Sequence, residues 1–164
     1  MNELLGKISS YHLFNYLLPG CLFAIVATKF THHEFTQPNL VLGLFLYYFY
    51  GLVISRIGSL VFEPFLRWVK FVTFADYGEF VAACKADSKI DELSEVNNMY
   101  RTLCSLLVVL VLLSAYFPIE DKWPGMRQFE LPASILILLA IFLLSYRKQT
   151  AYITKRVKAN LKAQ

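Results

Sequence analysis

Residues 11–30 read YHLFNYLLPGCLFAIVATKF, a run of twenty residues that carries no formal charge before Lys29. An α-helix rises about 1.5 Å per residue, so this run spans about 30 Å, the thickness of the hydrocarbon core of a bilayer. The run is therefore long and apolar enough to cross a membrane as one helix. It predicts a helical membrane protein, and three later stretches of the chain are apolar runs of the same kind.

These further apolar runs make the chain as a whole unusually rich in hydrophobic residues. Of its 164 residues, 57% are hydrophobic and only 17% are charged, and the mean hydropathy is +0.48. Soluble domains are closer to half apolar and one quarter charged. We therefore expect an all-α integral membrane helical bundle that forms a single membrane domain, 1–164. Its four transmembrane helices are expected at about 11–30, 40–61, 100–117 and 131–146.

The distribution of positive charge predicts the orientation of the bundle. Thirteen of the sixteen Lys and Arg residues, Lys7 among them, lie on the side that holds both termini and the 62–98 connection. The three on the other side are Lys29, Lys122 and Arg127. Because Lys and Arg accumulate in cytoplasmic loops, we expect the N and C termini to be cytoplasmic.

The 62–98 connection is the longest segment between the runs, and we expect cytoplasmic or interfacial helices in it. Asp76 and Ser88 are each followed three positions later by an acid, which is typical of a helix start. The helix after Ser88 has no breaker before the third run, so it is expected to continue into the membrane. An apolar and basic set ahead of these helices is predicted to lie in the interface or to dock a partner. This set is Phe65, Arg67, Trp68, Lys70 and Phe71.

The last segment, 147–164, is a basic tail without an acid. One interpretation is a helix that lies on the anionic inner leaflet of the membrane. The other is an ordinary positively charged cytoplasmic tail. The candidate residues of this membrane-surface tail are Lys155, Arg156, Lys158 and Lys162.

Polar residues near the cytoplasmic ends of the second and third runs predict an inner vestibule. Asn97, Arg101 and Ser105 recur every four positions and so share one helix face. Arg56 has apolar residues on both sides, and a charge at membrane depth is costly unless it is paired. We expect these four residues to line the vestibule, with Glu63 and Glu95 as counter-ions. The alternative for Arg56 is an interfacial anchor.

Small residues on the second run predict close helix packing. They would allow a neighbouring helix to approach, either within the chain or in a second copy. The set is Gly51, Ser55, Gly58 and Ser59. Because a four-helix chain has little interior of its own, we expect homo-oligomerisation.

Catalytic and metal-binding motifs are absent from the sequence. It contains no HExxH, GxxxxGK[ST], GxSxG or paired CxxC motif, so we expect neither an enzyme nor a cofactor. His32 and His33 adjoin Glu34, but neighbouring side chains do not easily face one ion, and no third ligand is evident in the sequence. A solvated loop without a metal is therefore expected. We also expect no direct binding of nucleic acid, and the bilayer is the expected environment.

Three stretches carry a resemblance to a known group of proteins: 8–20 (ISSYHLFNYLLPG), 55–59 (SRIGS) and 97–101 (NNMYR). With these and its overall layout, the chain resembles the small four-helix membrane proteins of bacterial anti-phage defence operons, such as the Kiwa-type membrane component. The resemblance transfers no functional residue. It implies the bacterial inner (cytoplasmic) membrane and a cytosolic partner from the same operon.

These expectations combine into a functional hypothesis. The chain is predicted to be a non-enzymatic, oligomeric inner-membrane protein that senses membrane perturbation and relays it to the cytosolic partner. Two alternatives stay open. One is a pore-forming effector, or ion channel, that depolarises the inner membrane on infection. The other is a lipid-binding accessory of a membrane enzyme.

Overall fold

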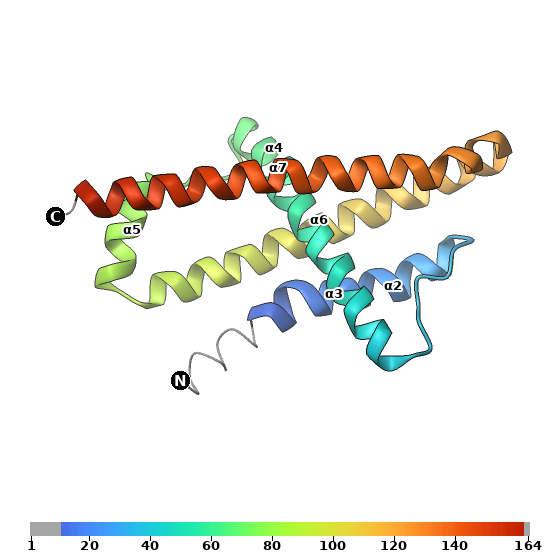
Figure 1. Cartoon of the computed structure of the whole chain (residues 1–164), viewed down its shortest axis with the longest axis horizontal. Coiled ribbons are helices and arrows are strands. Elements are labelled where there is room, and N and C mark those ends of the chain that lie inside the picture. The colour runs from blue at the N-terminus through green and yellow to red at the C-terminus, as the bar shows by residue number, and fades with distance from the viewer. Residues whose placement is uncertain (1–10, 163–164) are drawn as a thin grey trace.

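The computed structural model describes residues 11–162, and within them every regular element is a helix (Figure 1). The all-α prediction is confirmed. Lys7 and both chain ends lie outside the described residues. The elements are η1 Leu13–Leu17, α2 Leu18–Phe30, α3 Leu40–Ile57, η2 Gly58–Phe62, α4 Glu63–Trp68, α5 Tyr77–Ala86, α6 Lys89–Lys122, η3 Pro124–Met126 and α7 Arg127–Lys162.

Three helical stretches of the described chain are long and apolar enough to cross a membrane. They are Leu40–Trp68, Lys89–Glu120 and Arg127–Leu161, and a shorter apolar helix, Leu13–Lys29, precedes them. This architecture is typical of an integral membrane protein. Four spans and cytoplasmic termini remain predictions.

Two π-helical turns interrupt the first and second apolar helices, and each stands just before a proline. η1 ends one residue before Leu18-Pro19, and η2 ends just before Glu63-Pro64. A proline cannot donate to the carbonyl four residues back, and its ring collides with that carbonyl. Widening the preceding turn, with Leu18 N–H bonded to Leu13 O and Glu63 N–H to Gly58 O, relieves this conflict.

The helical core forms where η1 and α2 cross α3. A Cβ atom placed on Gly20 would lie 1.7 Å from Tyr47 O, and one on Gly51 would lie 1.7 Å from Tyr16 O. Both positions therefore require glycine, because the two backbones touch. Packed beside this crossing is a hydrophobic cluster to which α6 contributes. Its buried members are Phe23, Ala27, Ile54, Leu106 and Leu110.

The connection between α3 and α6 is only partly helical. α4 continues the helix of α3 and η2 and ends at Trp68, after which Lys70 takes a left-handed φ of 58°. The predicted docking residues consequently do not form one amphipathic helix. Phe65, Trp68 and Phe71 are all exposed. Arg67 stacks on the Phe74 ring with its Cζ 4.1 Å from the centroid, and Lys70 is exposed in the turn.

Both predicted helix starts after this turn are confirmed. The Asp76 side chain accepts a hydrogen bond from Gly78 N and begins α5. α6 begins at Lys89, but its first turn is capped differently from the prediction. Ser88 makes no side-chain cap bond, and Asp87 Oδ1 accepts from Lys89 N at 2.9 Å instead. α6 then runs unbroken for 34 residues, about 51 Å, from the polar connection through the third apolar run.

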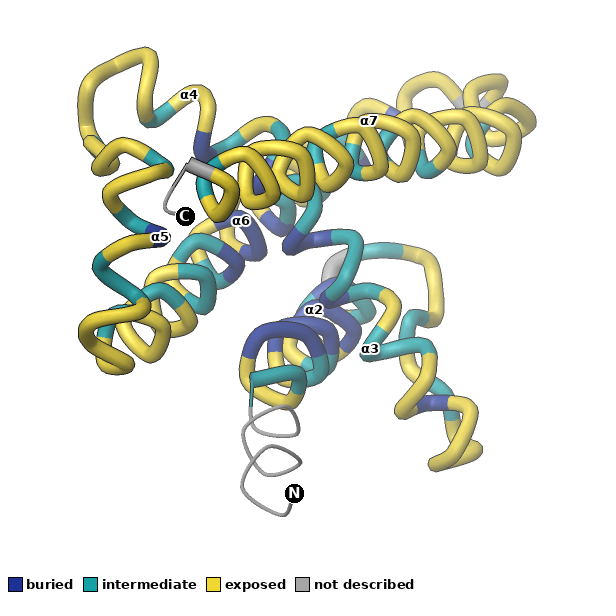
Figure 2. Tube along the Cα trace, turned by 60° about the vertical axis from the view of Figure 1, so that its left-hand side comes forward, coloured by how far each residue is buried: buried dark blue, intermediate teal, exposed yellow. Residues whose placement is uncertain are grey.

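Of the three long apolar stretches in the described residues, the one in α7 is the most exposed. Figure 1 shows α6 and α7 as a long hairpin that meets at η3, with α3 running obliquely across it. The most apolar stretch of α7 has none of its residues buried, and Figure 2 shows the helix exposed along most of its length. Since α7 continues without a break to Lys162, the tail keeps the axis of the preceding span instead of turning away from it. Lys155, Arg156 and Lys158 are exposed on it.

Candidate functional site

A buried polar joint connects three helices near the middle of the molecule. We define it as Asn15 on η1, Ser55 on α3, and Thr102 and Ser105 on α6, all of which are at most 1% exposed. The Thr102 hydroxyl lies 3.0 Å from Asn15 Oδ1 and 3.2 Å from Ser55 Oγ. Ser105 donates to the Ile54 carbonyl at 3.1 Å. The polar groups of the joint therefore satisfy one another away from solvent.

Helical phase explains which residues of α6 enter the joint. The Asn98 carbonyl one turn earlier lies 2.9 Å from the Thr102 hydroxyl, so the single hydroxyl proton is shared between this carbonyl and Asn15 Oδ1, and the Ser55 hydroxyl donates to Thr102. Ser105 follows on the same side of the helix. Asn97 is displaced by about 100° from Asn98 and is exposed. Asn97 of the predicted vestibule therefore does not reach the joint, because a strict four-residue repeat drifts around a helix of 3.6 residues per turn. The vestibule itself stays a prediction.

Among the residues that the structure describes, the hydrogen-bond partner of Arg56 is neutral. Its guanidinium donates to the Tyr16 hydroxyl at 3.3 Å, and Tyr16 is buried. Tyr16 stacks on the ring of His12, whose Nδ1 lies 3.3 Å from the Tyr48 hydroxyl. Glu95, predicted as a counter-ion, is exposed. Arg56 is thus tied to the aromatic side of η1.

A charge cluster lies next to the joint. We define it as Glu63 with the three cations around it, Arg67, Arg101 and Lys148. Glu63 is only 8% exposed, and its Oε2 accepts from Arg101 at 2.7 Å. Arg67 lies 3.5 Å and Lys148 3.9 Å from Glu63 Oε1. The prediction of Glu63 as a counter-ion is confirmed for Arg101. One acid faces three bases, so the cluster carries a net positive charge.

Lys148 also fixes α7 to the rest of the molecule. Its Nζ donates to both the backbone carbonyl and the hydroxyl of Ser59, at 2.5 and 2.7 Å. This contact with η2 adds to the bonds that join α7 to α6 near η3, where Tyr116 donates to Glu130 and Arg127 to Glu120. The π-helical turn η2 contains Ser59, and the π-helical turn η1 contains Asn15 of the joint. π-helical turns are frequent at functional sites.

The predicted small-residue face packs within the chain. Gly51 contacts the backbone of Tyr16, Ser55 belongs to the joint, and Ser59 holds Lys148. A Cβ on Gly58 would lie 3.2 Å from Ser105 Cβ. Since all four small residues are buried inside one copy, any surface for oligomerisation has to come from other helices.

The spacing along α6 relates the charge cluster to the membrane. Between Arg101 and Glu120 the sequence contains no charged residue. These two residues are about 28 Å apart along the helix axis, which matches a hydrocarbon core of about 30 Å. Arg101 and Glu120 therefore bound a stretch that is long and apolar enough to span a membrane, and Thr102 is its first residue.

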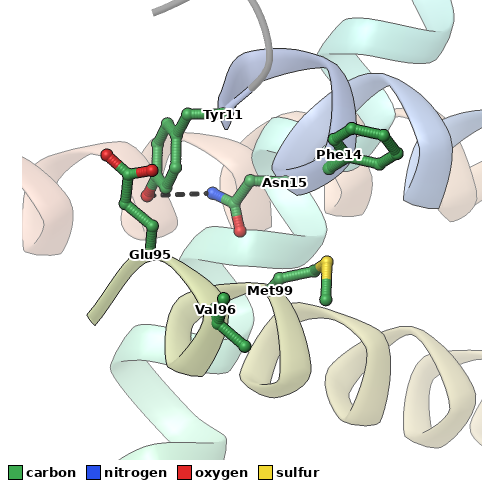
Figure 3. Close-up of a pocket in the computed structure, with 6 residues that line it drawn as sticks. All are labelled: Tyr11, Phe14, Asn15, Glu95, Val96 and Met99. Atoms are coloured by element: carbon green, nitrogen blue, oxygen red, sulfur yellow. Dashed lines mark hydrogen bonds between the residues drawn. The ribbon is translucent and has the colours of Figure 1, made fainter. Parts of the chain in front are cut away.

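A small pocket opens beside the joint, between η1 and the first half of α6 (Figure 3). Its volume is about 240 Å³, and Asn15 donates to the Tyr11 hydroxyl on its wall at 3.2 Å. Sites for cofactors and drug-sized ligands are usually 300–1,000 Å³. The pocket is thus too small for such a ligand. Its lining is Tyr11, Phe14, Asn15, Glu95, Val96 and Met99.

The chain matches no protein-family model, and no curated protein or solved structure matches it. The joint and the charge cluster are therefore interpreted from their own chemistry.

Sequence reasoning missed Asn15 and Thr102. The amide of Asn15 within an apolar run could have indicated this site, because polar residues in membrane segments are rare and are usually paired.

Proposed function

We propose that the chain is a non-enzymatic, oligomeric protein of the bacterial inner membrane that senses membrane perturbation and relays it to a cytosolic partner during phage infection. The observation that carries this proposal is the continuity of α6. One unbroken helix holds Thr102 in the buried joint and extends to Lys89 in the polar connection. Any displacement of α6 at the joint therefore moves its polar end.

The joint suits a sensing role because its bonds are specific but individually weak. Side-chain hydrogen bonds between membrane helices contribute about 0.6 to 2 kcal/mol each. Thr102 is held by Asn15 on η1 and by Ser55 on α3. Thinning or stretching of the bilayer that separates these helices by a few tenths of an ångström weakens both bonds together. α6 then moves between one position in which Thr102 is hydrogen-bonded to Asn15 and Ser55 and another in which these bonds are broken.

The exposed face of α7 supports the oligomeric part of the proposal. Its apolar stretch is not covered by the chain itself, so lipid or a second copy covers it. The exposed Phe65, Trp68 and Phe71 lie on α4 or just after it, next to Arg67 of the charge cluster, where the proposed orientation places the cytoplasm. They are available to a cytosolic partner.

A second candidate function, binding of an anionic lipid as accessory to a membrane enzyme, is favoured by the charge cluster. Arg101, Arg67 and Lys148 share the single acid Glu63, and Arg101 Nε is buried without a hydrogen-bond partner in the described chain. Basic pockets between helices at the cytoplasmic face bind lipid phosphates.

The experiment compares Thr102→Val with Ser114→Ala in cells that carry the native operon. Valine keeps the shape of threonine but leaves Asn15 and Ser55 without the Thr102 hydroxyl. Ser114 lies on the same helix, is exposed and bonds only the Val111 carbonyl among the hydrogen bonds found. We expect Thr102→Val to abolish the reduction in phage plaques at an unchanged membrane level, and Ser114→Ala to preserve it.

Each other outcome has a defined meaning. If the wild-type operon does not reduce plaques, the defence role is rejected. If it protects and Thr102→Val protects equally, the joint is not the relay. If the purified chain alone makes vesicles permeable to ions, the pore-forming alternative replaces the sensor. If activity depends instead on anionic lipid and is lost in Lys148→Gln, the lipid-binding function is favoured.

A further inference from the structure

The end of the molecule away from the charge cluster gathers three metal-ligating side chains from three different segments. His33 lies in the loop after α2, Glu120 near the end of α6, and Glu130 in the first turn of α7. One ligand atom from each of them lies within 4.8 Å of the other two. We propose that these residues bind a divalent transition-metal ion of the zinc type.

The orientation of each carboxylate supports this assignment. Glu130 Oε1 accepts from the Tyr116 hydroxyl at 3.1 Å, and its Oε2 faces His33 Nε2 at 3.5 Å. Glu120 Oε1 accepts from Arg127 at 2.5 Å. In both residues one oxygen is held by a neighbour and the other is left for an ion. Outer hydrogen bonds of this kind orient the ligands of metal sites.

The second oxygen of Glu120 is the independent sign that a ligand belongs here. Glu120 is 1% exposed, and its Oε2 has no hydrogen-bond partner within the described residues. Arg127 neutralises the carboxylate, but a buried oxygen that accepts no hydrogen bond is still unfavourable. A bound cation would remove this penalty without disturbing the bond between Arg127 and Oε1.

His33 is held in place by its surroundings while remaining accessible. Its backbone N–H donates to Thr31 Oγ1 at 3.3 Å, and its ring packs edge-on against Phe117 at 5.7 Å. The side chain is 50% exposed, which gives an ion access from solvent. In tetrahedral zinc sites the ligand atoms are about 3.4 Å apart, so the 3.5 Å between His33 and Glu130 already fits.

The donor set selects the type of metal. One imidazole and two carboxylates suit zinc and similar ions, whereas magnesium and calcium prefer oxygen ligands throughout. Three protein ligands leave a fourth position for water. The ion would connect the loop after α2 to the hairpin of α6 and α7, which are otherwise joined there by side-chain contacts. This site extends beyond the proposed relay and does not depend on it.

The test is direct binding to the full chain in mild detergent, purified with a tag that lacks histidine and stripped of metal with a chelator. Zn²⁺ is titrated by calorimetry, and Co²⁺ is titrated with its visible spectrum as the reporter of coordination. We expect one ion per chain. His33→Ala and Glu130→Gln should each weaken Zn²⁺ binding by at least about tenfold.

Two neighbouring residues provide matched controls. His32→Ala removes the adjacent imidazole, and Glu34→Gln removes the adjacent acid, which is bonded only to Thr36 among the hydrogen bonds found. Both should leave the affinity unchanged. The proposal is overturned if the wild type binds no Zn²⁺, if His33→Ala binds as tightly as wild type, or if Mg²⁺ displaces Zn²⁺. Because His33 is in an exposed loop, its variant tests the site even if changes at buried Glu120 prevent folding.

Discussion

Replacing Gly51 with alanine should separate η1 from α3 and disrupt the joint. The new Cβ would lie 1.7 Å from Tyr16 O, whereas ordinary contact begins near 3.4 Å, so the two backbones must part by about 1.7 Å. Overpacking of this kind costs about 1–3 kcal/mol. Asn15 lies on the displaced turn, so its 3.0 Å contact with Thr102 would lengthen beyond hydrogen-bonding distance, at a further cost of about 1 kcal/mol.

The expected total of about 3 kcal/mol corresponds to a fall in the thermal midpoint of roughly 6–12 °C for a chain of this size. The assay is thermal unfolding of the purified chain in mild detergent, followed by size-exclusion chromatography of the fraction that remains folded. Gly125→Ala is the matched control, because a Cβ there meets no atom within 4 Å. A Gly51→Ala midpoint equal to that of the control would refute the close contact between η1 and α3.

Two further predictions concern the charge cluster and the polar connection. Glu63→Gln should lower the midpoint by an amount equivalent to about 2 kcal/mol, because it leaves the partly buried Arg101 without its acid. Adding Arg101→Gln should recover part of the loss, and equal midpoints for Glu63→Gln and wild type would exclude this role. Burial and the side chain of Asp91 raise the pKa of the Cys84 thiol. A smaller fraction of Cys84 is therefore in the reactive thiolate form near neutral pH. In a variant whose other two cysteines are serine, an impermeant maleimide should therefore label Cys84 slowly at pH 7 and faster as pH rises. Asp91→Asn should speed labelling at pH 7, and a slower rate would contradict the assignment. Labelling only in inverted vesicles is expected from the predicted cytoplasmic location.

Local patterns were sufficient to predict most of the helices. The apolar runs predicted α3, α6 and α7, and the cap at Asp76 predicted α5, because hydrophobic length and first-turn hydrogen bonds depend on adjacent residues. The apolar pattern predicts a helix end at Phe117, whereas the helix continues to Lys122. The charged residues after Phe117 belong to the same helix, so the pattern does not indicate that Glu120 is buried.

Long-range contacts could not be predicted in the same way. Thr102 meets Asn15 across 87 positions and Ser55 across 47, and no local pattern specifies such pairs. Lys148 looked like one more base of the tail, yet it holds Ser59 on η2. The sequence shows no further ligand near His33, because Glu120 and Glu130 are far from it in sequence and lie beside it only in the folded chain.

The most direct test of the proposed function is the mass and composition of the complex purified in mild detergent from cells that carry the native operon. We expect an oligomer of this chain with a stoichiometric cytosolic protein bound to it. The bound protein should be lost when residues 65–94 are replaced by a flexible linker and retained in Ser114→Ala. A monomer without a partner, or a homo-oligomer that conducts ions by itself, would contradict the proposed sensor and relay function.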